Sequence, residues 1–172
     1  MGTSDFDRDA AWDDAIAAVG ILSDRNLARR TGLVESYVAQ WHWHGGCLDP
    51  GGMARIRVNR YRVRATIKAE VFDKWQDARS EVKRRVLTGA EWQGVIEWIQ
   101  GAGFWQLPSS HRPSSYGFHG ETWMIEGFRD GQFHFVRRST WNILDGQGAE
   151  VFRVGKSMGR LAGVTLFQDA QE

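Results

Sequence analysis

The spacing of hydrophobic residues indicates a β-strand in the first half of the chain. After Tyr37, the side chains of Trp41 and Trp43 alternate with those of His42 and His44. A period of two places the tryptophans on one face of a strand and the histidines on the other. Glycine-rich turn sequences follow at 45–46 and 49–52, and they separate this strand from the next alternating run.

The run from Met53 to Phe72 also alternates, but its phase changes. Arginines occupy odd positions before Asn59 and even positions after it. Because a shift of one residue exchanges the two faces of a strand, this change requires either a β-bulge or a tight turn between two strands. A further short strand is predicted at 82–87.

A capping box predicts the best-defined helix. Thr88 and Glu91 have the T-x-x-E spacing in which each side chain satisfies a backbone N–H at the helix start. Apolar residues then recur at helical spacing up to a glycine shortly after residue 100. A similar stripe predicts a second main helix at 149–163, and residues 1–31 have a helical pattern.

Asp130-Gly131 is the clearest hairpin signal, because this pair is preferred in a type I′ turn. Two apolar-rich runs, 122–128 and 132–138, flank it. A two-residue turn determines the register of the strands. It predicts these opposed pairs: Phe128 with Phe133, Glu126 with Phe135, Met124 with Arg137, Gly127 with His134, Ile125 with Val136 and Trp123 with Arg138. Both faces are apolar, so we expect the hairpin to be central and covered.

These elements predict a single α+β domain over residues 1–172. A helical N-terminal segment would occupy residues 1–32 and an α+β core residues 33–172. The core would consist of a mostly antiparallel sheet of about five or six strands, packed by two main helices.

Composition excludes several function classes. The 172 residues carry 22 Lys and Arg against 21 Asp and Glu, so a net charge of +1 provides no global attraction for nucleic acid or anionic lipid. No apolar stretch suits a membrane span or a signal peptide. The single cysteine, Cys47, cannot form an internal disulfide. We therefore expect a cytoplasmic protein that is not associated with membranes.

The C-terminal half resembles an uncharacterised family of small bacterial proteins. In this pattern a helix is followed by a Phe-Trp-x-Leu-Pro segment and then by a hairpin. The resemblance extends over roughly residues 36 to 162, and the residues that carry it are Glu91, Trp92, Phe104, Trp105, Leu107, Pro108, Gly120, Trp123, Glu126, Gly127, Gly131, His134 and Arg138. It implies an α+β fold and brings no established activity.

Alternating arginines and surplus tryptophans favour a binding role. Arg60, Arg62 and Arg64 would project from one strand face toward an acidic partner. Trp41 and Trp43 would serve as exposed aromatic anchors. No catalytic or cofactor-binding motif accompanies them. The sequence thus favours a non-catalytic module without a cofactor, such as an inhibitor or immunity-type protein. Its expected partner is a protein, with nucleic acid as the alternative.

A DNA-binding regulator is the second hypothesis. Small, turn and core residues between 23 and 41 match the spacing of a helix-turn-helix. Four residues of its second helix would then face the major groove: Glu35, Ser36, Ala39 and Gln40. This helix would contain an acidic residue and no Lys or Arg, and it would continue directly into the alternating Trp-His segment. Residues 34–44 are thus either helix or strand.

A metal-dependent enzyme is the third hypothesis. His42, His44 and Cys47 form an H-x-H-x-x-C cluster, and two imidazoles on the same strand face can share a Zn²⁺ or Cu²⁺ ion. Two histidines before a glycine turn are more often ordinary surface residues. The sequence therefore does not favour a metal site over a binding surface.

Overall fold

The structure, a computed structural model, describes residues 32–44, 52–73, 78–109, 120–140 and 148–164. The helical segment predicted for residues 1–31 lies outside this part of the chain. Two compact units make up the chain, Met1–Leu33 and Val34–Glu172. The elements below belong to the second unit, apart from the first residue of the first strand.

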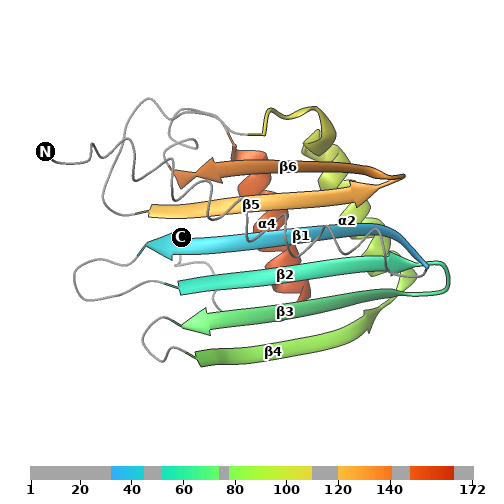
Figure 1. The fold of residues 1–172 in the computed structure, drawn as a ribbon, viewed down its shortest axis with the longest axis horizontal. Coiled ribbons are helices and arrows are strands. Elements are labelled where there is room, and N and C mark those ends of the chain that lie inside the picture. Colours follow the sequence, from blue (N-terminus) through green and yellow to red (C-terminus); the bar gives the residue numbers. More distant parts are fainter. Residues whose placement is uncertain (1–31, 45–51, 74–77, 110–119, 141–147, 165–172) are drawn as a thin grey trace, which may run out of the picture. The chain divides into compact units, whose positions relative to one another are not determined.

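Six strands form one antiparallel sheet in the order β4-β3-β2-β1-β5-β6 (Figure 1). The first four strands are consecutive neighbours, and the last hairpin joins on the other side of β1. The bounds of the strands are β1 Leu33–His44, β2 Gly52–Tyr61, β3 Ala65–Asp73, β4 Ala78–Leu87, β5 Gly120–Arg129 and β6 Gln132–Ser139. The α+β class and the number of strands agree with the sequence-based prediction.

Two helices lie on the same face of the sheet (Figure 1). Helix α2 spans Gly89–Gly101 and is followed by the short 3₁₀ helix η2, Phe104–Gln106. Helix α4 spans Ala149–Leu161 after β6. Among the described residues, no helix is long and apolar enough to span a bilayer.

The tight turn between two strands, rather than a bulge, explains the phase change after Asn59. The backbone N–H of Tyr61 donates to the carbonyl of Arg64 at 2.8 Å, which closes the β2–β3 hairpin. Before the turn, the even-numbered residues of β2 face the helices. After it, the odd-numbered residues of β3 do so, because Val58 lies opposite Ile67.

The β5–β6 hairpin has the predicted turn and register. Asp130 and Gly131 both have positive φ, 52° and 78°, as a type I′ turn requires. Phe128 lies opposite Phe133, and every other predicted pair is also confirmed. The expected central position is wrong for one of the two strands. Strand β5 is interior, whereas β6 is the last strand in the sheet order.

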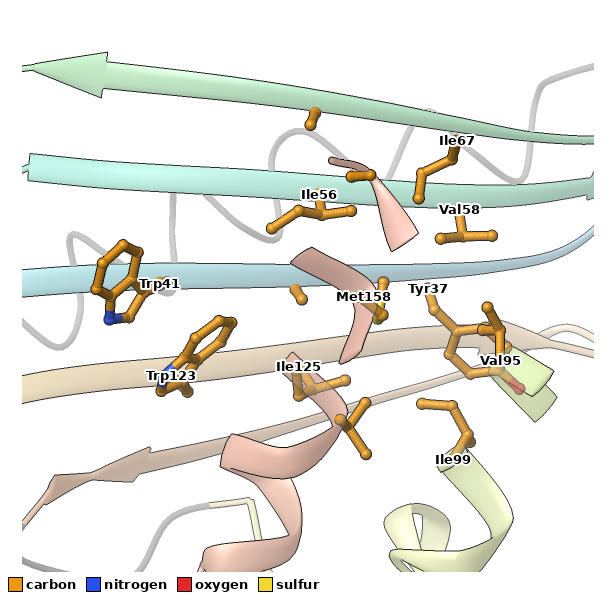
Figure 2. Packing of buried hydrophobic residues seen from close by; sticks show 14 of the residues in the cluster. Tyr37, Trp41, Ile56, Val58, Ile67, Val95, Ile99, Trp123, Ile125 and Met158 are labelled. Atoms are coloured by element: carbon orange, nitrogen blue, oxygen red, sulfur yellow. The ribbon is translucent and has the colours of Figure 1, made fainter. Parts of the chain in front are cut away.

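The core lies between the sheet and the helices. Side chains from β1, β2, β3 and β5 point toward α2 and α4 and are fully or almost fully buried (Figure 2). The labelled members are Tyr37, Trp41, Ile56, Val58, Ile67, Val95, Ile99, Trp123, Ile125 and Met158. Burial of this apolar surface is the main contribution that holds the two layers together.

Arg85 on β4 connects the two helices. Its guanidinium group donates to the Glu91 carboxylate at 2.9 and 2.8 Å and to the Leu161 carbonyl at 2.8 Å. Glu91 also completes the predicted capping box with Thr88 at the start of α2. One side chain thus binds the first turn of α2 and the last turn of α4, where positive charge is favourable.

Replacing Glu91 with Gln is expected to remove a pH-dependent part of the stability. The Arg85 guanidinium and the Thr88 backbone N–H lower the pKa of Glu91 from 4.5 to about 2. Because the folded-state pKa is below the unfolded value, the ionised carboxylate stabilises the fold above about pH 4.5. This contribution disappears as the pH falls toward 2. Urea unfolding of both proteins at several pH values should show a stability difference that closes on acidification.

The matched control for this experiment is Glu97→Gln, which neutralises an exposed carboxylate farther along α2. It keeps the capping box and the contacts of Arg85 intact. A stability difference between wild type and Glu91→Gln that does not change with pH would contradict the assigned role of the Glu91 charge.

Candidate functional site

The turn between β2 and β3 carries the three predicted arginines. Arg60 is the penultimate residue of β2, while Arg62 and Arg64 lie within the turn and are exposed. Val63 stands between them with 91% of its surface exposed. The prediction that all three arginines share one strand face is therefore wrong. Arg62 and Arg64 lie at the hairpin tip, because the chain reverses between Tyr61 and Ala65, whereas Arg60 is on the helix-facing side of β2, opposite Ala65.

A row of cations crosses the sheet beside this tip. Arg57 on β2 lies opposite Lys68 on β3, and Lys68 lies opposite Arg84 on β4. Arg57 and Lys68 point to the sheet face opposite the helices, because the residues next to them in the sequence, Val58, Ile67 and Ala69, lie in the core. Arg84 is paired with Lys68 and therefore points to the same face. Like charges on directly opposed residues are unfavourable. Within the row, Lys68 is bound to Glu70 on its own strand at 2.7 Å.

Together the tip and the row form a surface that we call the cationic corner, made of Arg57, Arg62, Arg64, Lys68 and Arg84. It also exposes two apolar side chains, Val63 and Val86, the latter 58% exposed. Guanidinium groups bind carboxylates and phosphates through paired N–H donors. The corner is thus chemically suited to holding an acidic group and to packing against a small apolar one.

The sequence assigned neither Arg84 nor Val86 to this surface. Both lie on β4, which is longer than the strand predicted at 82–87. Their proximity to the arginine turn depends on the pairing of β3 with β4, in which Thr66 lies opposite Val86. The run of consecutive cations from Lys83 to Arg85 was the sequence signal that could have indicated this part of the surface.

The two tryptophans predicted as exposed anchors belong to the other end of the sheet. Trp41 is only 7% exposed, and its ring lies 4.5 Å from that of Trp43 and 5.9 Å from that of Trp123. Trp43 is half-buried and packs closely over Gly52. The assignment of Trp41 as an exposed partner-binding residue is therefore wrong, because the ring belongs to the core.

The four residues assigned to a recognition helix are in a strand. Glu35, Ser36, Ala39 and Gln40 belong to β1 and pair with β5. Ser36, Ala39 and Gln40 are also buried, so they cannot reach base edges. Residues 35–40 therefore do not form the second helix of the proposed helix-turn-helix. They continue the strand that the alternating Trp-His segment predicted. The first half of that motif lies largely outside the described residues.

Buried polar pairs on β1 take the place of that predicted surface. The Gln40 amide donates to the Glu126 carboxylate at 3.1 Å, and the Ser36 hydroxyl donates to the side-chain oxygen of Asn59 at 2.7 Å. All four side chains are buried. These bonds join β1 to β5 and to β2, and we assign them to fixing the strand register, since buried polar groups require specific partners.

An aromatic cluster surrounds Tyr37 at the start of β1. Its ring lies 6.3 Å from Phe104 and 6.4 Å from both Trp92 and Trp105. The hydroxyl donates to the Glu35 carboxylate at 2.5 Å. Burial, followed by this carboxylate, raises the pKa of Tyr37 well above its usual value. The hydroxyl therefore stays protonated at neutral pH and acts as a structural donor rather than a base.

Two of the three predicted metal ligands belong to the part of the chain that the structure describes. His42 is half-buried on β1, and His44 ends the same strand, whereas Cys47 lies outside the described residues. No group of three or more His, Cys, Asp or Glu suited to a metal ion occurs among the residues that the structure describes.

No family model matches the chain, and no curated protein matches it. The resemblance to an uncharacterised bacterial family therefore remains a prediction from the sequence.

Proposed function

We propose that the protein is a non-catalytic binding module that recognises an acidic surface of another macromolecule through the cationic corner. The observation that carries this proposal is the position of the arginines. Arg62 and Arg64 are exposed on either side of Val63 in a four-residue turn. Arg84 lies on β4, directly opposite Lys68 of the strand that follows this turn.

Two properties of the corner support a binding role. The turn is closed by a backbone hydrogen bond, so the arginines are presented by a short, defined loop. Its charges are concentrated, although the whole chain carries a net charge of only +1. Clustered cations increase the rate at which an acidic partner associates and favour one orientation. An inhibitor or immunity-type protein would use such a surface to cover an acidic region of its target.

Replacing both Arg62 and Arg64 with Glu is expected to weaken binding to an acidic probe about tenfold. The double change removes two attractive contacts and adds two repulsive ones, each on the order of 0.3–0.5 kcal/mol at an exposed site. Fluorescence anisotropy with labelled poly-L-glutamate would measure the affinity. Binding to wild type should also weaken as salt is added, because exposed charges are screened.

The matched control reverses two exposed arginines elsewhere. Arg153 and Arg160 lie on α4, on the helix-bearing side of the sheet, and Arg153→Glu with Arg160→Glu causes the same change in net charge. Circular dichroism would verify that both double variants fold. Equal losses of affinity in the two variants would show that net charge, not the cationic corner, determines binding.

A further inference from the structure

Strand β4 is the outermost strand on one side of the sheet, and its end is exposed. Figure 1 shows β4 beyond β3, and no other strand follows it in the described part of the chain. The side chains of Arg84, Arg85 and Val86 are all exposed at this edge. In an edge strand, some backbone N–H and C=O groups point away from the sheet and can pair with another strand.

Part of the opposite edge of the sheet is occupied by the protein's own chain. The backbone N–H of Arg137 on β6 donates to the carbonyl of Ser109 at 2.7 Å, and the Arg138 guanidinium donates to the carbonyl of Pro108 at 3.0 Å. The His134 imidazole also contacts the Leu107 carbonyl at 3.1 Å. The segment after η2 thus runs beside β6 and occupies part of its hydrogen-bonding edge.

The side chains of β4 are divided between the two faces. Lys83 and Arg85 point to the helix side, where they donate to the carbonyls of Gly163 and Leu161. These contacts hold the strand end against α4. Arg84 and Val86 point to the opposite face, as their partners Lys68 and Thr66 do. The edge is therefore anchored on one side and presents a cation and an apolar side chain on the other.

We propose that an extended acidic segment of a partner protein adds to the sheet as a strand beside β4. This inference rests on the proposed function, since the same cationic corner would select the partner. Acidic side chains of the added strand would meet Arg84 and the arginines of the neighbouring turn, and an apolar side chain would cover Val86. The backbone supplies affinity, and the side chains supply specificity.

Charge complementarity favours this occupant over a second copy of the chain. Pairing two copies through β4 would bring together the consecutive cations Lys83, Arg84 and Arg85 of each, which is unfavourable. A nucleic acid would satisfy the arginines but has no strand backbone to pair with the edge. Charged residues on edge strands also protect against aggregation. That role accounts for Arg84 but not for the exposed Val86 beside the Val63 turn.

A short peptide of alternating Glu and Val, about eight residues long, tests the proposal on the full chain. Its control carries the same side chains but is N-methylated at every residue, so it has no backbone N–H groups. Fluorescence anisotropy would give both affinities, and NMR would follow the backbone amides of residues 83–87. We expect the unmodified peptide to bind at least about tenfold more tightly than its N-methylated control. We also expect Arg84→Glu to weaken its binding.

The remaining outcomes separate the two proposals. Equal binding of both peptides, with loss in the Arg62→Glu, Arg64→Glu variant, would overturn strand addition and retain the acidic-partner function. No binding of either peptide or of poly-L-glutamate would overturn both. Preferential binding of single-stranded DNA of equal length and charge would replace the protein partner with a nucleic acid.

Discussion

Replacing Phe104 with Ala is expected to lower the free energy of unfolding by about 3 to 5 kcal/mol. Phe104 is only 2% exposed, and its ring meets Tyr37, Trp105 and His134 at centroid distances of 6.3, 5.2 and 5.0 Å. It also lies directly over Gly127, where an added Cβ would approach the ring to 2.6 Å. Removing the ring leaves a cavity between η2 and the sheet that rigid aromatic neighbours cannot readily fill. Urea unfolding would measure the loss.

Phe133→Ala is the matched control for this cavity. Phe133 lies at the start of β6 and is 44% exposed, so its truncation removes much less buried surface. We expect a loss below about 1 kcal/mol, because surface changes of this kind have small effects. Comparable losses in the two variants would contradict the assignment of Phe104 as a central packing residue.

Replacing Gly155 with Ala is expected to destabilise the protein by about 2 kcal/mol, although alanine favours a helix. A Cβ at this position would lie 2.1 Å from a ring carbon of Trp123. Trp123 is fully buried between Trp41 and Phe152, so the ring has little room to move. Helix α4 would have to shift away from β5. Thermal and urea unfolding would both report the change.

Gly94→Ala on α2 should have the opposite effect. There the added Cβ would lie 3.8 Å from Trp98, an ordinary contact distance. The substitution therefore keeps the helix in place and reduces the conformational freedom of the unfolded chain. We expect a gain of about 0.5–1 kcal/mol. A gain from Gly155→Ala as well would show that α4 does not pack tightly on Trp123.

Local sequence signals predicted the elements whose geometry depends on neighbouring residues. Asp130-Gly131 adopts the positive φ angles of its turn and thereby sets the register of β5 with β6. Thr88 and Glu91 form the predicted capping box, so the predicted start of α2 is confirmed. In each case the interacting groups are separated by few residues, and residue type alone restricts the conformation.

The candidate site could not be predicted from local patterns, because it depends on how the strands pair. Arginine spacing suggested a single strand face for Arg60, Arg62 and Arg64, because alternation cannot distinguish a continuing strand from a tight turn. The hydrogen bond between Tyr61 and Arg64 settles that choice. Arg84 then joins the corner only because β4 pairs with β3. In the same way, alternation does not determine whether Trp41 is exposed or buried. The pairing of β1 with β5 places Trp123 against its ring.

The sequence by itself determined the α+β class, the capped helix, the type I′ hairpin and the presence of a phase change after β2. Hydrophobic period, turn preference and capping act over a few residues, and the chain encodes them directly. Only the tertiary structure decided that residues 35–41 form an interior strand, that the arginines gather beside β4, and that β4 remains exposed at one edge. These features depend on contacts between residues far apart in the chain, whose energies local propensity does not contain.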